Sequence, residues 1–293
     1  MSVKKMHILA CLVAGTSMVG TSQAAVLVND TFSDNERATQ SLPNSAAWYI
    51  GTVNAALASG YSAVNGNLDL PYISSGAAHT QLAYFTGSGS PIVLANVGDS
   101  LSMSVRVTMD EIASNDTDFR VGFFNSVGSR LTGDWNGTST ITDGYAGYQA
   151  RFDPSGYLAS FTERTIPNTL GQQLFGGGST ILLTSAAPTG GSALTAGTAF
   201  NIQFTLTRSS VTQITLNSSI NGGTRSVIDP NTILTNFDTI AFFGATNITS
   251  GTVALGNGLT LDDVVVTFTP IPEPTTLAAV ACALVLGLGR RRA

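Results

Sequence analysis

The sequence predicts an all-β protein, an antiparallel jelly-roll β-sandwich with a separate segment at each end. Three observations predict it. Apolar and polar residues alternate along several segments, clusters of Gly, Asn, Asp and Pro separate these segments, and no stretch between the two ends has helical periodicity. Charged residues make up only 11% of the 293 residues, against about 25% in an ordinary soluble domain.

Alternation is clearest in residues 101–109, where every odd position is apolar and every even position is polar. Residues 200–207 and 264–269 repeat the pattern. A strand with this pattern buries one face and exposes the other to water. Further strands are expected at residues 46–50, 67–73, 81–85, 118–124, 144–152, 157–162, 181–183, 212–220 and 239–243. About a dozen short strands predict a single sandwich domain over residues 25–270.

The N-terminus has the pattern of a secretory signal peptide. Lys4 and Lys5 precede a short apolar run, and small residues precede Ala24. The run is too short to span a membrane as a helix. We therefore expect residues 1–24 to direct export through the Sec translocon, with cleavage after Ala24; an amphipathic first helix is the alternative.

At the C-terminus, Pro272, Glu273 and Pro274 precede an apolar stretch that ends in three arginines, Arg290, Arg291 and Arg292. This order resembles the PEP-CTERM sorting signal of Gram-negative bacteria, here over residues 271–293. The resemblance implies recognition by an exosortase, a membrane protease-transpeptidase, and processing near Pro-Glu-Pro. It also implies delivery to the cell envelope or extracellular matrix of a bacterium that makes extracellular polysaccharide.

The physical properties of this C-terminal stretch are those of a temporary membrane anchor. Residues 275–289 form about 22 Å of helix, which is shorter than the hydrocarbon core of about 30 Å. The arginines are expected to stay on the cytoplasmic side. A permanent membrane anchor is the alternative interpretation.

Separating the two ends changes the charge of the chain. The net charge of the whole chain is −5. Residues 25–271 carry eight arginines against 17 carboxylates, hence −9, and contain neither lysine nor cysteine, because Cys11 and Cys282 lie in the ends. No disulfide is therefore expected in the sandwich, and the absence of a basic patch argues against nucleic-acid binding.

The two ends of the sandwich carry a second, looser resemblance. Asp30, Thr31 and Phe32 open it, and residues 261–266, with Asp262 and Asp263, close it. These segments resemble concanavalin A-like and carbohydrate-binding jelly rolls. The resemblance implies that the first and last strands pair, and that a structural Ca²⁺ binds near Asp30, Asp262 and Asp263. The alternative is that Asp262 and Asp263 are turn residues at the entry of a strand.

Residues with catalytic chemistry are few. His79 is the one histidine of residues 25–271, no cysteine nucleophile exists there, and no Gly-x-Ser-x-Gly motif is present. A lone histidine also argues against catalytic zinc. The three glutamates of residues 25–271, Glu36, Glu111 and Glu163, form no closely spaced acidic motif. We therefore assign no catalytic residue and expect His79 at a surface or strand start.

Aromatic residues supply the candidate carbohydrate contacts. Trp135 lies between Gly-Asp and Asn-Gly in a long loop, so we expect it to be exposed. Tyr145, Tyr148 and Arg151 follow, with alternation placing the two tyrosines on opposite faces of one strand.

These observations favour an exported, non-catalytic β-sandwich with a structural or adhesive role and contact with extracellular polysaccharide. Two alternatives stay open. One is a carbohydrate-binding module. The other is a polysaccharide lyase or glycoside hydrolase, which a groove lined by Tyr145, Tyr148, Arg151 and His79 would favour.

Overall fold

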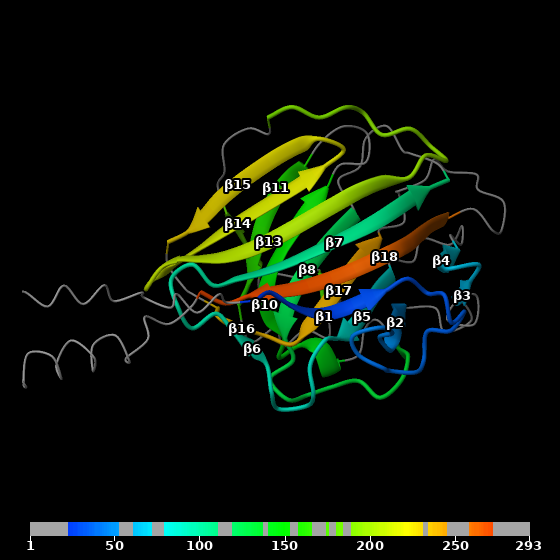
Figure 1. The fold of residues 1–293 in the computed structure, drawn as a ribbon, viewed down its shortest axis with the longest axis horizontal. Helices are drawn as coiled ribbons and strands as arrows, with labels where there is room; N and C mark the ends of the chain where they lie inside the picture. The colour runs from blue at the N-terminus through cyan, green and yellow to red at the C-terminus, as the bar shows by residue number, and fades with distance from the viewer. Residues whose placement is uncertain are drawn as a thin grey trace, which may run out of the picture. The chain divides into compact units, whose positions relative to one another are not determined.

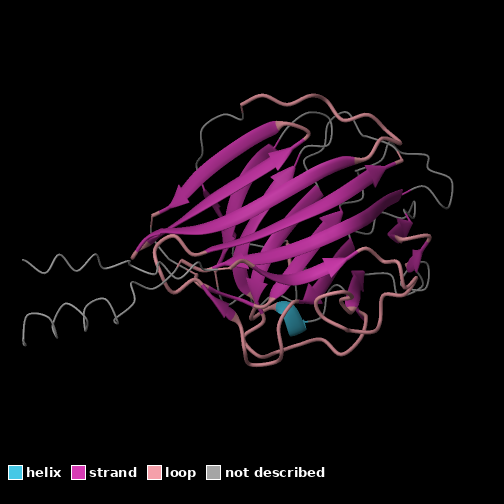
Figure 2. Cartoon of the chain, in the orientation of Figure 1, coloured by secondary structure: helices cyan, strands magenta, loops and turns pink. Residues whose placement is uncertain are grey.

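The computed structural model describes residues 23–52, 61–71, 79–110, 119–136, 140–152, 158–165, 174–175, 180–183, 189–230, 234–244 and 258–271. Within these ranges the regular secondary structure consists of strands, apart from one 3₁₀ turn, Thr140–Thr142, and loops connect the strands (Figure 2). Most of the predicted signal peptide and all of the Pro-Glu-Pro and arginine segment lie outside the described residues. In the described part, no helix is long and apolar enough to cross a bilayer.

The first sheet has eight strands and contains both ends of the sandwich. Its order is β15 (Gly223–Asp229), β14 (Gln213–Ile220), β13 (Phe200–Ser210), β7 (Ser100–Met109), β18 (Gly258–Thr269), β4 (Asn67–Pro71) and β3 (Ser62–Val64), and β1 (Ala25–Asp30) also pairs with β18. All of these pairs are antiparallel. The predicted pairing of the first and last strands is confirmed, with Asp30 opposite Val264.

The second sheet also has eight strands. Its order is β12 (Thr180–Leu183), β11 (Leu158–Arg164), β10 (Ala146–Phe152), β8 (Phe119–Asn125), β17 (Thr239–Gly244), β5 (His79–Tyr84), β2 (Trp48–Thr52) and β9 (Trp135–Asn136). The pairs are antiparallel except that β9 runs parallel to β2. A separate two-stranded ladder joins β6 (Ile92–Val93) to β16 (Asn236–Phe237). Figure 1 shows β13, β7 and β18 of the first sheet in front of β8, β10 and β17 of the second.

The core lies between the two sheets, where the inward faces of the alternating strands meet. In β7 all five odd residues from Leu101 to Met109 are buried. Phe204 of the first sheet stacks on Phe123 of the second with 5.7 Å between ring centroids. Apolar burial on this scale is the main stabilising contribution in a chain without cysteine in its sandwich. The predicted fold class, an antiparallel jelly-roll sandwich, is confirmed.

One buried carboxylate ties the first strand to the second sheet. Asp30 accepts hydrogen bonds from Phe32 N at 2.9 Å, Ala46 N at 3.0 Å and Trp48 Nε1 at 2.9 Å. Asp30 is only 1% exposed, and Trp48 belongs to β2 of the other sheet. The carboxylate therefore links the chain's first strand to the opposite layer.

We predict that Asp30→Ala lowers the free energy of unfolding by about 3 kcal/mol, because three buried N–H groups lose their acceptor. Urea denaturation of the wild type and the variant measures the difference. Asp34→Ala is the matched control, since Asp34 is exposed and accepts one hydrogen bond, from Glu36 N. Equal losses in the two variants would contradict the structural role of Asp30.

Candidate functional site

The outer face of the first sheet is covered with uncharged polar side chains. Strand register aligns them in rows that cross β7, β13, β14 and β15. One row contains Ser104, Gln203, Ser219 and Thr224, and the next contains Ser102, Thr205, Asn217 and Ser226. Because alternate residues of each strand point inward to the core, this face is the direct consequence of the period-two pattern.

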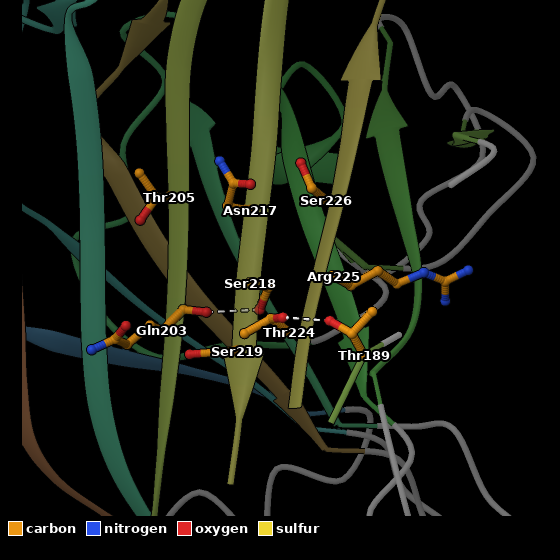
Figure 3. Close-up of a pocket in the computed structure, with 9 residues that line it drawn as sticks. All are labelled: Thr189, Gln203, Thr205, Asn217, Ser218, Ser219, Thr224, Arg225 and Ser226. Atoms are coloured by element: carbon orange, nitrogen blue, oxygen red, sulfur yellow. Dashed lines mark hydrogen bonds between the residues drawn. The ribbon is translucent and has the colours of Figure 1, made fainter. Parts of the chain in front are cut away.

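These rows line a hollow of about 460 Å³, here called the polar hollow (Figure 3). Its lining residues come from β13, β14, β15 and the segment before β13: Thr189, Gln203, Thr205, Asn217, Ser218, Ser219, Thr224, Arg225 and Ser226. A second hollow of about 240 Å³ shares Gln203 and Thr205 with it and extends across β7 to Val265 and Thr267 of β18.

Hydrogen bonds fix one end of the polar hollow. Thr189 and Thr224 exchange backbone hydrogen bonds of 2.9 Å, and their hydroxyl oxygens lie 2.9 Å apart. Ser218 donates to the carbonyl of Gln203 at 2.7 Å. These contacts hold the segment around Thr189 against the edge strand β15.

The polar hollow is electrically neutral where it faces solvent. Gln203, Asn217, Thr224 and Ser226 are exposed. Among the nine described lining residues, Arg225 is the one that carries a charge, and it directs its guanidinium away from the others (Figure 3). The nine lining residues include no carboxylate and no histidine. Such a surface donates and accepts hydrogen bonds but supplies no general acid or base.

The two candidate tyrosines do not reach the surface. Tyr148 lies in the core between the sheets, where its hydroxyl donates to Asp229 Oδ2 at 2.7 Å. Tyr145 lies in a second apolar cluster, and its hydroxyl donates to the Ser129 carbonyl at 2.6 Å. The expected opposite orientation is confirmed. The expectation that these rings contact carbohydrate is wrong, because both are 0% exposed.

The other two candidate carbohydrate contacts, Trp135 and Arg151, lie in different strands of the second sheet. Trp135 is in the short edge strand β9, not in an open loop, and is half-buried. Its indole occupies the space above Gly51, where an added Cβ would lie 2.1 Å from Trp135 Cζ2. The expectation of an exposed tryptophan is therefore corrected. Arg151 is half-buried in β10.

His79 begins β5, as the strand-start interpretation expects, but it is buried rather than at the surface. Its Nδ1 is hydrogen-bonded to the hydroxyl of Tyr61. Burial lowers the pKa of His79 to about 4. His79, Tyr145, Tyr148 and Arg151 therefore do not line one groove, and the arrangement that would favour a lyase is not formed.

The acidic residues of the predicted calcium site have other partners. The oxygens of Asp30 accept from N–H groups, while Asp262 bonds to the Arg106 guanidinium and Asp263 Oδ2 lies 3.5 Å from Arg106 Nε. Among the described residues, no group of three or more histidine, cysteine or acidic side chains is placed to hold a metal. Asp263 has a positive φ of 49° at an irregularity in β18. Calcium binding stays an untested prediction.

Sequence reasoning missed a pair of buried carboxyl groups. Glu163 of β11 is 2% exposed and Asp229 of β15 is 0% exposed, so the two sheets bring acidic side chains into the core. Burial, reinforced by the negative charge of Asp229, raises the pKa of Glu163 to about 7. The spacing in sequence gives no signal for this pair, because its members lie 66 positions apart on different sheets.

No family model matches the chain, and no curated protein matches it. Among solved structures, lectin I-B4 from Griffonia simplicifolia is similar at 11% identity, covering 85% of this chain and 99% of that one, with a TM-score of 0.40. An endo-1,3-β-glucanase from Streptomyces sioyaensis is similar at 13% identity, with 84% of this chain and 97% of that one covered and a TM-score of 0.42. An alginate lyase is similar at 13% identity, with 85% of this chain and 97% of that one covered and a TM-score of 0.38. Likeness at this level assigns neither a site nor an activity.

We predict that Glu163 makes stability depend on pH. Folding raises its pKa from 4.5 to about 7, so the folded protein retains a proton that the unfolded chain releases. This contribution is complete below about pH 4.5 and is lost as the pH rises to about 7. Glu163→Gln should remove this part of the fall in the free energy of unfolding, measured by urea denaturation across that window.

Glu36→Gln is the control, because it makes the same substitution at a glutamate that is only half-buried. The wild type and the Glu36 variant should show the same decline. A Glu163→Gln profile that declines in parallel with the wild type would exclude this role for the buried pair.

Proposed function

We propose that this chain is an exported, non-catalytic β-sandwich protein that contacts neutral polysaccharide through the polar hollow. Its role is structural or adhesive. The observation that carries the proposal is the lining of the hollow, in which rows of hydroxyl and amide groups face solvent without a carboxylate or an inward cation. Sugar hydroxyls are matched by such groups, because each is both a donor and an acceptor.

Charge supports the choice of a neutral ligand. Residues 25–271 carry a net charge of −9, which disfavours long-range association with a polyanion. None of the nine described lining residues is aromatic, so binding relies on hydrogen bonds worth about 1 kcal/mol each. We therefore expect weak binding of short oligosaccharides. Long polysaccharide chains should be bound more strongly, because one chain can contact several protein molecules at once.

The ends of the sequence support delivery to the cell surface or extracellular matrix. In this proposal residues 1–24 direct export through the Sec translocon. An exosortase then recognises Pro272, Glu273, Pro274 and the terminal arginines, and the apolar stretch anchors the chain in the membrane until it is processed.

We predict that at least one neutral polysaccharide retards the wild-type protein in affinity gel electrophoresis. Dextran, laminarin and a galactomannan are suitable probes. Asn217→Ala combined with Thr205→Ala should abolish most of the retardation, because both side chains lie in one row of the polar hollow. Ser90→Ala is the control, since Ser90 is exposed and is not a lining residue.

The assignment to the polar hollow would be refuted if none of the three polysaccharides lowered the mobility of the wild type below its mobility in a gel without polysaccharide. It would also be refuted if the double variant were retarded as strongly as the wild type. Assays for new reducing ends and for unsaturated products, on the same polysaccharides, separate binding from the enzymatic alternative. Product formation by the wild type would replace the non-catalytic proposal with that alternative.

We predict that the mature protein from its native host ends near Pro272 and begins at Ala25. Mass spectrometry of the intact protein and of its terminal peptides measures both ends and any group attached at the C-terminus. Mature surface material that retains Arg290, Arg291 and Arg292 would contradict sorting by an exosortase.

A further inference from the structure

The polar hollow and the smaller hollow beside it are two parts of one groove. The polar hollow, of about 460 Å³, lies over β13, β14 and β15, and the hollow of about 240 Å³ lies over β13, β7 and β18. They meet at Gln203 and Thr205 of β13, which line both. The combined groove, here called the cross-strand groove, therefore extends over five neighbouring strands of the first sheet.

Two rows of register partners form the floor of the cross-strand groove. The row that contains Gln203 continues to Val265 of β18, and the row that contains Thr205 continues to Thr267 of the same strand. Each row has one residue on each of the five strands, and all ten members line one hollow or the other. The groove is two rows wide and five strands long, so it runs across the strands.

The two rows of the floor are uncharged. Nine of the ten residues end in a hydroxyl or an amide group, and Val265 is the exception. On one border of the floor, Arg106 of β7 is paired with Asp262. On the other border, Thr207 and Thr215 are register partners. The floor therefore matches a ligand that is neutral along its length and rich in hydroxyl groups.

The spacing within each row favours one shape of sugar chain. Neighbouring members of a row are about 5 Å apart, because that is the distance between paired strands. An extended β-1,4-linked pyranose chain advances by a similar length with each sugar, so successive sugars meet successive strands. An α-1,4-linked chain coils into a helix, and it loses this register over five strands, which span about 20 Å.

The two amide side chains of the floor are exposed. Gln203 and Asn217 lie on neighbouring strands, in different rows. Neither amide group forms a hydrogen bond with another residue drawn in Figure 3. An amide group both donates and accepts, so each of these side chains can bind two hydroxyls of one pyranose.

We propose that the cross-strand groove binds a single chain of a neutral β-1,4-linked polysaccharide, with one sugar over each of its five strands. This inference rests on the proposed function, and it adds the linkage of the polysaccharide and the direction in which the chain lies. Gln203 binds hydroxyls at the middle of the groove and Asn217 binds those of the next sugar. Ser102 and Thr267 bind the sugars at the β18 end.

The test is calorimetric titration of the full chain with oligosaccharides that differ in linkage or in length. Cellopentaose and mannopentaose are β-1,4-linked, and maltopentaose is the α-1,4-linked control. At least one β-1,4-linked pentaose should bind about tenfold or more tightly than maltopentaose. The same pentaose should exceed its own disaccharide by a similar factor, because five strands contribute hydrogen bonds instead of two.

A shortened groove gives a second measurement. Ser102→Ala combined with Thr267→Val removes two hydroxyls at the β18 end, so it should weaken binding of the preferred pentaose about tenfold and that of its disaccharide less than about twofold. Thr108→Val combined with Thr260→Val is the matched control, because these residues are register partners on the same two strands and line neither hollow. The control should bind the pentaose as the wild type does.

Equal affinity of the wild type for the three pentaoses would overturn the inference, and so would an affinity that stops rising at two sugars. An equal loss in the two double variants would also reject it. The comparisons of linkage and length use the wild type alone, so they hold even if a variant fails to fold.

Failure of this inference is distinguishable from failure of the proposed function. If the pentaoses show no preference for linkage while a neutral polysaccharide still retards the wild type in gel electrophoresis, this inference fails and the proposed function stands. A wild type that no neutral polysaccharide retards and no pentaose binds would remove both.

Discussion

The structure depends on one constraint, the burial of two apolar strand faces against each other. Each long strand of the sandwich has one apolar face, and these faces form a common core that contains residues of both sheets. The chain has no cysteine in this region to supply a covalent link. Stability therefore requires most inward positions to remain apolar, with Glu163 and Asp229 as buried exceptions, and groups that contact other molecules must lie on the outward positions.

The outward faces of the two sheets differ in polarity and in solvent exposure. The first sheet presents serine, threonine, asparagine and glutamine, and its face is open at the polar hollow. The second sheet buries much of its outer face as well, beneath a second apolar cluster that includes Leu131, Tyr145, Leu174 and Phe175. A sheet covered on both sides lacks the clean alternation of a half-exposed sheet. Arginines and glutamine in that covered face, such as Arg164 and Gln149, are therefore the unusual feature of the fold.

The sequence predicted the fold class because alternation is a local property. Residues 101–109 and 200–207 lie in strands, and the pairing of the two terminal strands followed from the loose resemblance to jelly rolls. Strand β15 was missed, since residues 223–229 begin with glycine and place Arg225 among few apolar residues.

The candidate site was harder to predict, because it depends on neighbours far apart in the chain. Tyr148 lies in β10 and Tyr145 directly precedes it, and polar aromatics in such a segment occur at surface and core positions alike. Their burial against partners such as Ser129 and Asp229 depends on residues far along the chain. The polar hollow was not predicted at all. Its residues are common serines and threonines, and they become a surface only when strand register aligns Gln203, Ser219 and Thr224.

The central claim is that the open polar face of the first sheet, rather than an aromatic groove, contacts neutral polysaccharide. A crystal structure of the protein with an oligosaccharide of a neutral polysaccharide that it binds tests this most directly. The account predicts sugar hydroxyls within hydrogen-bond distance of Gln203, Asn217 and Thr224, across β13, β14 and β15. A neutral sugar seated against Trp135, or on the second sheet, with the polar hollow empty, would contradict it.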